Sequence, residues 1–341
     1  MNETTQLMLE SAERLLRDAC PKAVVDQVEA GERPDALWAE LEALGLLNAC
    51  VPEGQGGVGL PLAEGLTLLR LAGRYAVPVP FAETLLGRAL ASEAGMPEAL
   101  EGMMTIAVPA VQGEGYAPVP FAPWARWVLV AQAGPDGAVS FQCLPQEQLT
   151  FSEPRKGLAG EPEALMLGGD GQGPSFFSPL APSLAKLQGL LALSRAVMMA
   201  GALESALDLS VAYALERKQF GREIAKFQAV QQQLAVLTGE VAAALRAADA
   251  GLEALGSPRE ATAWAVAKAR AGEAAGKGAE IAHQVHGAMG FTHEHQLHHR
   301  TRRLWCWRDQ HGHEAYWQAV LGRALCAAGA DALWPELTGS A

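Results

Sequence analysis

Residues 213–235 decide the fold, and they read Tyr213-Ala-Leu-Glu-Arg-Lys-Gln-Phe-Gly-Arg-Glu-Ile-Ala-Lys-Phe-Gln-Ala-Val-Gln-Gln-Gln-Leu-Ala235. The pattern predicts a helix, a tight break at Gly221 and a second helix that begins near Phe227. Because glycine lets the backbone turn sharply, the break presents the guanidinium of Arg217 beside the ring of Phe220. An exposed corner between two helices would have the same geometry, but it would not explain why Arg-x-Gln-Phe-Gly and Phe-Gln occur together.

A second informative segment lies downstream and reads Gln284-Val-His-Gly-Ala-Met-Gly-Phe-Thr292. Its glycines, Gly287 and Gly290, would let backbone amides approach a pyrophosphate closely. A Gly-x-x-Gly pair alone is more often a turn than a ligand site. The segment therefore gains its meaning from its occurrence together with the first one.

Three regions of different character divide the chain. Residues 1–102 read as helices, and residues 103–180 contain short apolar runs separated by proline and glycine, which predict a small β-domain. Residues 181–341 return to alanine-rich helices, whose small side chains allow close antiparallel packing in a four-helix bundle. The predicted fold class is α+β, mainly α. The long helices are expected over residues 184–216, 227–255, 259–289 and 316–333.

The composition is that of a globular chain and excludes several classes of protein. Half of the 341 residues are apolar, and the net charge of −12 argues against nonspecific binding of nucleic acid. No apolar run is long and uninterrupted enough to predict a membrane span, and the N-terminus lacks a signal-peptide pattern. The five scattered cysteines include no Cys-x-x-Cys pair, which favours a thiol-reduced, cytoplasmic protein.

The two segments together resemble the signatures of the acyl-CoA dehydrogenase family of flavoproteins. In that family, an arginine and a glutamine of this kind hold the ADP part of an FAD molecule that is bound mainly by a neighbouring subunit. Ala288 replaces a family glycine, which is a mild departure. The helical, β, helical order also resembles the family layout across nearly the whole chain. The resemblance implies FAD as the cofactor and the following cofactor-binding residues: Arg217, Gln219, Phe220, Gln228, Gln284, Gly287 and Gly290.

The resemblance also implies a reaction and partners. Family members desaturate an acyl-CoA thioester between its α- and β-carbons: a carboxylate removes the α-proton and the flavin accepts a hydride from the β-carbon. The electrons then leave to an electron-transfer flavoprotein. A shared FAD site implies either a homo-oligomer or a heterotetramer with a fuller acyl-CoA dehydrogenase subunit.

Neither position at which the family places its catalytic glutamate carries one here. Counting back from Arg323 puts the usual position at His311, and an alternative position used by some members falls at Leu191. His311 is a candidate base because a neutral imidazole can abstract a proton near neutral pH. Asp309 is a second candidate for the base. Glu314 could also reach the reaction site if the loop differs in conformation from that of the family. The opposing interpretation is that this loop no longer catalyses.

The β-domain departs from the family as well. The family has Thr-Glu-Pro-x-x-Gly-Ser-Asp beside the flavin ring, whereas this chain has Val108-Pro-Ala-Val-Gln-Gly113. The chain therefore resembles the short subunits of α2β2 assemblies in bacterial degradation of steroid side chains, including its segment 302–309. A second hypothesis follows: a non-catalytic partner subunit that completes the FAD site of another chain.

All eight histidines lie between His283 and His313, which raises the third possibility of a metalloprotein. Adjacent histidines on a helix point in different directions, so we expect a solvated polar face and no metal ligands. Arg195 lies one turn past a position where the resembled family often has a substrate-contacting arginine, so the resemblance allows a contact to CoA or the acyl tail. We expect a charge on the helix surface instead.

Overall fold

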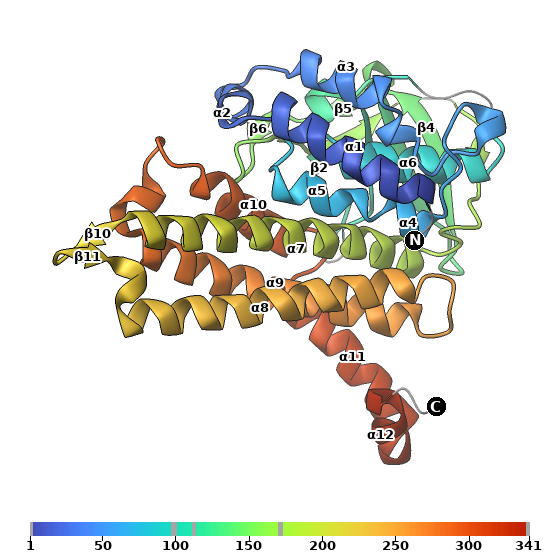
Figure 1. Ribbon diagram of the computed structural model, residues 1–341. Coiled ribbons are helices and arrows are strands. Elements are labelled where there is room, and N and C mark those ends of the chain that lie inside the picture. Colours follow the sequence, from blue (N-terminus) through green and yellow to red (C-terminus); the bar gives the residue numbers. More distant parts are fainter. Residues whose placement is uncertain (1–2, 97–100, 111–113, 170–172, 339–341) are drawn as a thin grey trace.

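A computed structural model describes residues 3–96, 101–110, 114–169 and 173–338 (Figure 1). Its elements follow the helical, β, helical order, which confirms the predicted fold class. The N-terminal helices are α1 Glu3–Ala19, α2 Lys22–Ala30, α3 Asp35–Ala43, α4 Leu62–Gly65, α5 Leu68–Arg74 and α6 Phe81–Glu93. The short 3-10 helices are η1 Leu46–Asn48, η2 Glu53–Gln55, η3 Ala122–Trp124, η4 Gln146–Gln148, η5 Ile224–Lys226 and η6 Gly287–Phe291.

The β-domain is built on one four-stranded sheet in the order β1-β3-β4-β9. β1 runs parallel to β3, and the other pairs are antiparallel. Alternate residues of β4, including Phe141, point into the core, as expected for a half-buried strand. The sheet strands are β1 Met104–Ala107, β3 Trp127–Ala133, β4 Val139–Pro145 and β9 Ser175–Phe176. The smaller ribbons contain β2 Val119–Pro120, β5 Leu149–Phe151, β6 Arg155–Lys156, β7 Pro162–Ala164 and β8 Met166–Gly169.

The C-terminal half is a bundle of long helices that lies against the N-terminal helices in Figure 1. Its close packing depends on glycine at particular points. A methyl group added to Gly73 of α5 would collide with the Met198 carbonyl, and one added to Gly201 of α7 would collide with the Arg70 carbonyl. The backbones of α5 and α7 therefore touch. The helices of this half are α7 Leu184–Glu216, α8 Gln228–Glu253, α9 Glu260–His286, α10 Leu297–Asp309, α11 Glu314–Ala328 and α12 Ala330–Thr338. In Figure 1, α11 and α12 lead away from the other four.

The structure corrects three details of the predicted helices. The break at Gly221 is a small β-hairpin, with β10 Lys218–Gln219 and β11 Arg222–Glu223. α9 ends at His286 rather than at residue 289, because Gly287 takes a positive φ of 58°. The last predicted helix is divided at Gly329.

α7 is long and apolar enough to cross a membrane by length and composition alone. However, 89% of its most apolar window is buried inside the protein. It is the central core helix, and one apolar core connects it with the N-terminal helices and the inner face of the sheet.

Candidate functional site

The hairpin that follows α7 projects from one end of the bundle (Figure 1). Lys218 pairs with Glu223 and Gln219 with Arg222, so the loop consists of Phe220 and Gly221 alone. Both loop residues have positive φ, 53° and 78°. A two-residue hairpin loop of this hand normally carries glycine or asparagine, and phenylalanine is rare in this conformation. The backbone therefore holds the Phe220 ring outward at a conformational cost.

The exposed face of the hairpin is aromatic as well as cationic. Phe220 is 92% exposed, and its ring lies edge-on to Phe227 with 6.1 Å between ring centroids. The Arg222 guanidinium lies over the Phe227 ring, 4.3 Å from its centroid. Such a pair presents a flat surface of the kind on which a nucleobase stacks.

The polar side chains that the sequence assigned to FAD are exposed at this end. Arg217, Gln219, Gln228 and Gln284 make no side-chain hydrogen bond or ion pair with any other residue that the structure describes. Arg217 caps the end of α7, and Gln228 begins α8. These groups are available to a ligand or to another chain.

The C-terminal end of α9 lies beside the same end of α7. The Tyr213 ring of α7 stacks on the His286 ring of α9, with centroids 4.6 Å apart. Gly287 turns the chain into η6, and nothing lies within 4 Å of the position where its side chain would be. Gly290 is instead packed, because a Cβ there would lie 3.1 Å from His283 Nδ1. The structure thus places the two sequence segments at one end of the bundle, on separate turns.

The expectation that the histidines form a solvated face is wrong for four of them. His283, His286, His298 and His299 are all buried. Burial lowers the pKa of His298 to about 4 and that of His295 to about 4, with neighbouring histidines adding to the effect. The error arose because helical spacing alone does not reveal that α2 covers part of α10.

His311 lies in a loop that is held by a buried lysine. Lys268 Nζ donates to the carbonyl oxygens of Arg308 at 2.7 Å and Gly312 at 2.6 Å. Trp317 Nε1 donates to the carbonyl of His311 at 3.0 Å. Burial, followed by the charges of Arg195 and Lys268, lowers the pKa of His311 well below its usual range. The imidazole is therefore neutral but weakly basic.

Arg195 is 3% exposed, so the expectation of a surface charge is wrong. Its guanidinium is paired with the buried carboxylate of Glu83 on α6, and its Nε donates to Gln310 Oε1 at 2.6 Å. The cavity beside this ion pair measures about 10 Å³ and is also lined by Glu161. That volume holds at most one water molecule, whereas an organic ligand needs on the order of 300 Å³ or more.

Arg195 and Gln310, which line this small cavity, lie close in sequence to the two positions where the resemblance placed a catalytic base. Leu191 lies one turn before Arg195 on α7 and is buried, and His311 follows Gln310. Three further interior groups, Glu83, Glu161 and Lys268, were not predicted from the sequence. Burial raises the pKa of Glu161 despite the opposing charge of Arg303. Residues 111–113 of the altered flavin segment lie outside the described residues.

The two carboxylates near His311 differ in their surroundings. Asp309 is exposed at the end of α10. Glu314 accepts a hydrogen bond from Arg308 Nε at 2.8 Å and a second bond from the same guanidinium. The hydrogen bonds from Arg308 lower the pKa of Glu314 to about 2. Glu314 is therefore a fixed anion that joins α10 to α11.

Glu314→Gln is expected to remove part of the acid sensitivity of the fold. A depressed carboxyl pKa contributes stability that is complete above the unfolded pKa of 4.5 and is lost as pH falls toward about 2. Denaturant unfolding of both proteins at pH 7, 4 and 3 measures this. The two stabilities should converge as the pH falls, and a constant difference between them would contradict the assignment.

The sequence matches two family models. The acyl-CoA dehydrogenase N-terminal domain matches residues 2–105, and the acyl-CoA dehydrogenase C-terminal domain matches residues 188–325. Acyl-CoA dehydrogenase IpdE2 of Mycolicibacterium smegmatis is 29% identical over 307 residues, which cover 87% of this chain and 91% of that protein. Acyl-CoA dehydrogenase FadE34 of Mycobacterium tuberculosis is 30% identical over 293 residues, which cover 78% of this chain and 39% of FadE34.

Two solved structures share the fold closely. One is described as the Tcur3481-Tcur3483 steroid ACAD G363A variant, with a TM-score of 0.82, 24% identity, and coverage of 96% of this chain and 99% of that chain. The other is the ChsE4-ChsE5 complex from Mycobacterium tuberculosis, with a TM-score of 0.81, 21% identity, and coverage of 97% and 99%. At these identities the likeness establishes the fold.

Proposed function

Because the chain belongs to the acyl-CoA dehydrogenase family, we propose that it is a dehydrogenase subunit that completes the FAD site of a neighbouring chain. Members of this family are FAD flavoproteins. The complex would desaturate an acyl-CoA thioester. The neighbour would supply the catalytic carboxylate and hold the flavin ring, and electron-transfer flavoprotein would receive the electrons.

The observation that carries the proposal is the contrast between the C-terminal end of α7 and the surroundings of Arg195 further back on the same helix. At one end, Arg217 and Phe220 are exposed, and the Arg217 side chain lacks a partner among the described residues. The guanidinium can bind a phosphate of FAD through two parallel hydrogen bonds. Gln219, Gln228 and Gln284 add amide groups, and the turn at Gly287 leaves room for a ligand. The residues present fit the adenosine diphosphate end of the cofactor.

The space beside Arg195 does not fit a reacting acyl chain. Arg195 and Gln310 lie close in sequence to the two candidate base positions, and the cavity beside the buried pair of Arg195 and Glu83 measures about 10 Å³. The flavin accepts a hydride when it is bound, but a reacting acyl chain also needs a pocket of its own. The chain thus supports cofactor binding across an interface better than catalysis within itself.

A self-sufficient dehydrogenase that uses His311 or Asp309 as the base is the second candidate. A neutral His311 between Arg195 and Lys268 would have to accept a proton beside positive charge, and this opposes formation of the imidazolium. Asp309 is exposed to solvent rather than directed at the cavity lining. The geometry therefore favours the partner subunit.

Visible spectroscopy distinguishes the two candidates. We expect the purified chain alone to show no flavin absorbance and to have no effect on an acyl-CoA. Co-expression with full-length acyl-CoA dehydrogenase subunits of the same organism should yield a yellow complex whose flavin is bleached by substrate. A steroid-derived acyl-CoA is the first substrate to test, because one similar solved structure is a steroid ACAD. A yellow homo-oligomer of this chain that reduces its own flavin would refute the proposal.

His311→Asn is expected to leave kcat of the assembled complex within about twofold, since removal of a working general base costs about 10²–10⁴-fold. Stopped-flow reduction of the flavin measures the step directly. A loss of that size, with unchanged FAD content, would identify His311 as the base and favour the self-sufficient enzyme.

A further inference from the structure

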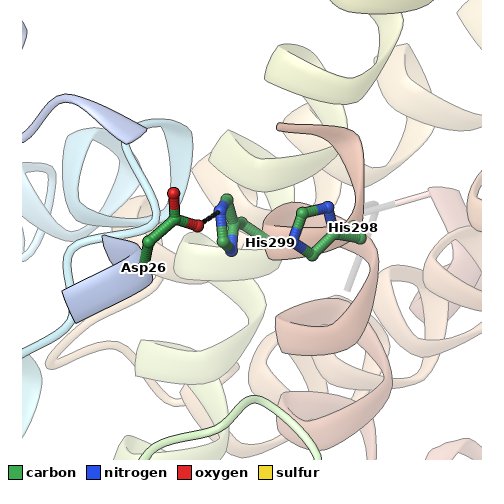
Figure 2. Close-up of side chains that lie close together, drawn as sticks. All are labelled: Asp26, His298 and His299. Atoms are coloured by element: carbon green, nitrogen blue, oxygen red, sulfur yellow. Dashed lines mark ion pairs between the residues drawn. The ribbon is translucent and has the colours of Figure 1, made fainter. Parts of the chain in front are cut away.

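Two helices that are far apart in sequence bring Asp26, His298 and His299 together. Asp26 lies on α2, and the histidines are adjacent on α10 (Figure 2). One potential ligand atom from each residue lies within 4.8 Å of the others. None of the three belongs to the FAD end or to the cavity beside Arg195.

His299 is oriented by a carboxylate. Its Nδ1 lies 2.8 Å from Glu29 Oε1, and because a carboxylate can only accept, Nδ1 carries a proton. Its Nε2 lies 2.9 Å from Asp26 Oδ1 without the alignment of a hydrogen bond. A bare nitrogen lone pair that close to a carboxylate oxygen is repelled, so a cation must mediate the contact. That cation is either a second proton on the ring or a metal ion.

His298 distinguishes between these two cations. Its Nδ1 lies 2.7 Å from the His295 carbonyl and so carries a proton, which leaves Nε2 as a lone pair. The side chain is 8% exposed, and Nε2 has no hydrogen-bond partner among the described residues. A proton on His299 would leave this buried nitrogen unsatisfied, whereas one metal ion would satisfy both histidines and Asp26.

We propose that Asp26, His298 and His299 form a binding site for a divalent transition-metal ion, of which Zn²⁺ is the representative. Imidazole nitrogen and carboxylate oxygen are ligands that zinc prefers. Each histidine donates its other N–H to an oxygen acceptor, which is the support that metal-bound histidines usually have. The Asp26 side chain is 40% exposed, so a route from solvent and a position for a bound water are present.

The spacing of the ligand atoms and the nearby charges both affect how a metal ion would bind. A tetrahedral zinc site places its ligand atoms roughly 3.3 Å apart. The three candidate atoms lie within 4.8 Å of one another, so small side-chain movements would complete the site. Lys22 and Arg302 add positive charge nearby, while Glu29 and Asp26 add negative charge. The bound ion would link α2 to α10 and so join the N-terminal helices to the bundle.

Zinc binding by the tag-free full chain tests the site, with the chain in its complex if it is purified as one. After removal of metal with EDTA, titration calorimetry with ZnCl₂ and elemental analysis should give one zinc per chain. Asp26→Asn and His298→Gln should each weaken binding at least tenfold. Asp18→Asn is the matched control for Asp26→Asn, because Asp18 is an exposed carboxylate on α1, outside the three-residue site, and it should retain binding.

Zinc should also raise the unfolding temperature of the wild-type chain but not that of Asp26→Asn. Asp26 is partly exposed, so this variant remains informative if His298→Gln does not fold. Absence of saturable zinc uptake would overturn the site. Uptake that survives Asp26→Asn, or that Asp18→Asn abolishes, would overturn it equally.

Discussion

Arg217→Ala is expected to weaken FAD binding by the assembled complex about tenfold to a hundredfold, because a hydrogen bond to a charged group contributes about 1.5–3 kcal/mol. The side chain makes no hydrogen bond or ion pair with the rest of the described chain, so the fold should be unaffected. Fluorescence titration of the flavin-free complex with FAD measures the affinity. Thermal unfolding of the isolated chain should be unchanged.

Lys218→Ala is the matched control for this experiment. It removes an equal charge from the same hairpin, but adjacent strand residues point to opposite faces. A decrease of less than about twofold is expected if charge is not the deciding factor. Equal losses of FAD affinity in both variants would show that Arg217 acts only through the overall positive charge of the hairpin. No loss in either would remove the hairpin from the cofactor site.

Glu83→Ala is expected to destabilise the chain by about 3–5 kcal/mol, because it leaves the buried Arg195 guanidinium without its counter-charge. The double variant Glu83→Leu with Arg195→Met should recover most of the loss, since apolar groups of similar volume replace buried pairs well. Urea unfolding of the isolated chain gives both values. Arg246→Ala, which breaks an exposed ion pair with Glu253, should cause no measurable change.

The Glu83 variants also test how far the interior depends on this ion pair. Recovery of stability in the double variant would show that apolar groups can replace the pair. If the single variant is as stable as the wild type, Arg195 has another partner or reaches water, and the assignment of Glu83 as its counter-charge is wrong.

The long helices were predictable because their signals are local. The start of α7 is marked by Ser183, whose hydroxyl accepts a hydrogen bond from the Lys186 N–H, and its end by the sequence that forms the hairpin. Gly287 ended α9 earlier than the apolar pattern indicated, since the pattern continues past the turn. The two- to four-residue ribbons of the β-domain are too short to leave a periodic signal.

The site was only half predictable for a related reason. The placement of Arg217 and Gln228 at an exposed turn could be predicted because their neighbours in sequence are also their neighbours in space. Arg195 could not, because Glu83 and Gln310 reach it from α6 and from the loop after α10. The burial of His299 depends in the same way on Asp26 and Glu29. Contacts between distant elements decide which charges are interior, and one sequence does not encode them in any local pattern.

The length of α7 sets the distance between two parts of the chain that were described separately above. The helix carries Arg195 near its middle and ends at Arg217, and a continuous α-helix fixes these residues about 33 Å apart along its axis. The hairpin and the buried ion pair are therefore separate regions of the chain, and a change in one leaves the other in place. Under the proposed function, each chain contributes to one FAD site through its hairpin, and the neighbouring chain holds the flavin ring of that FAD. A tetramer of two such chains with two flavin-holding chains would contain one FAD for every two polypeptides, a ratio that absorbance per mole of protein reveals.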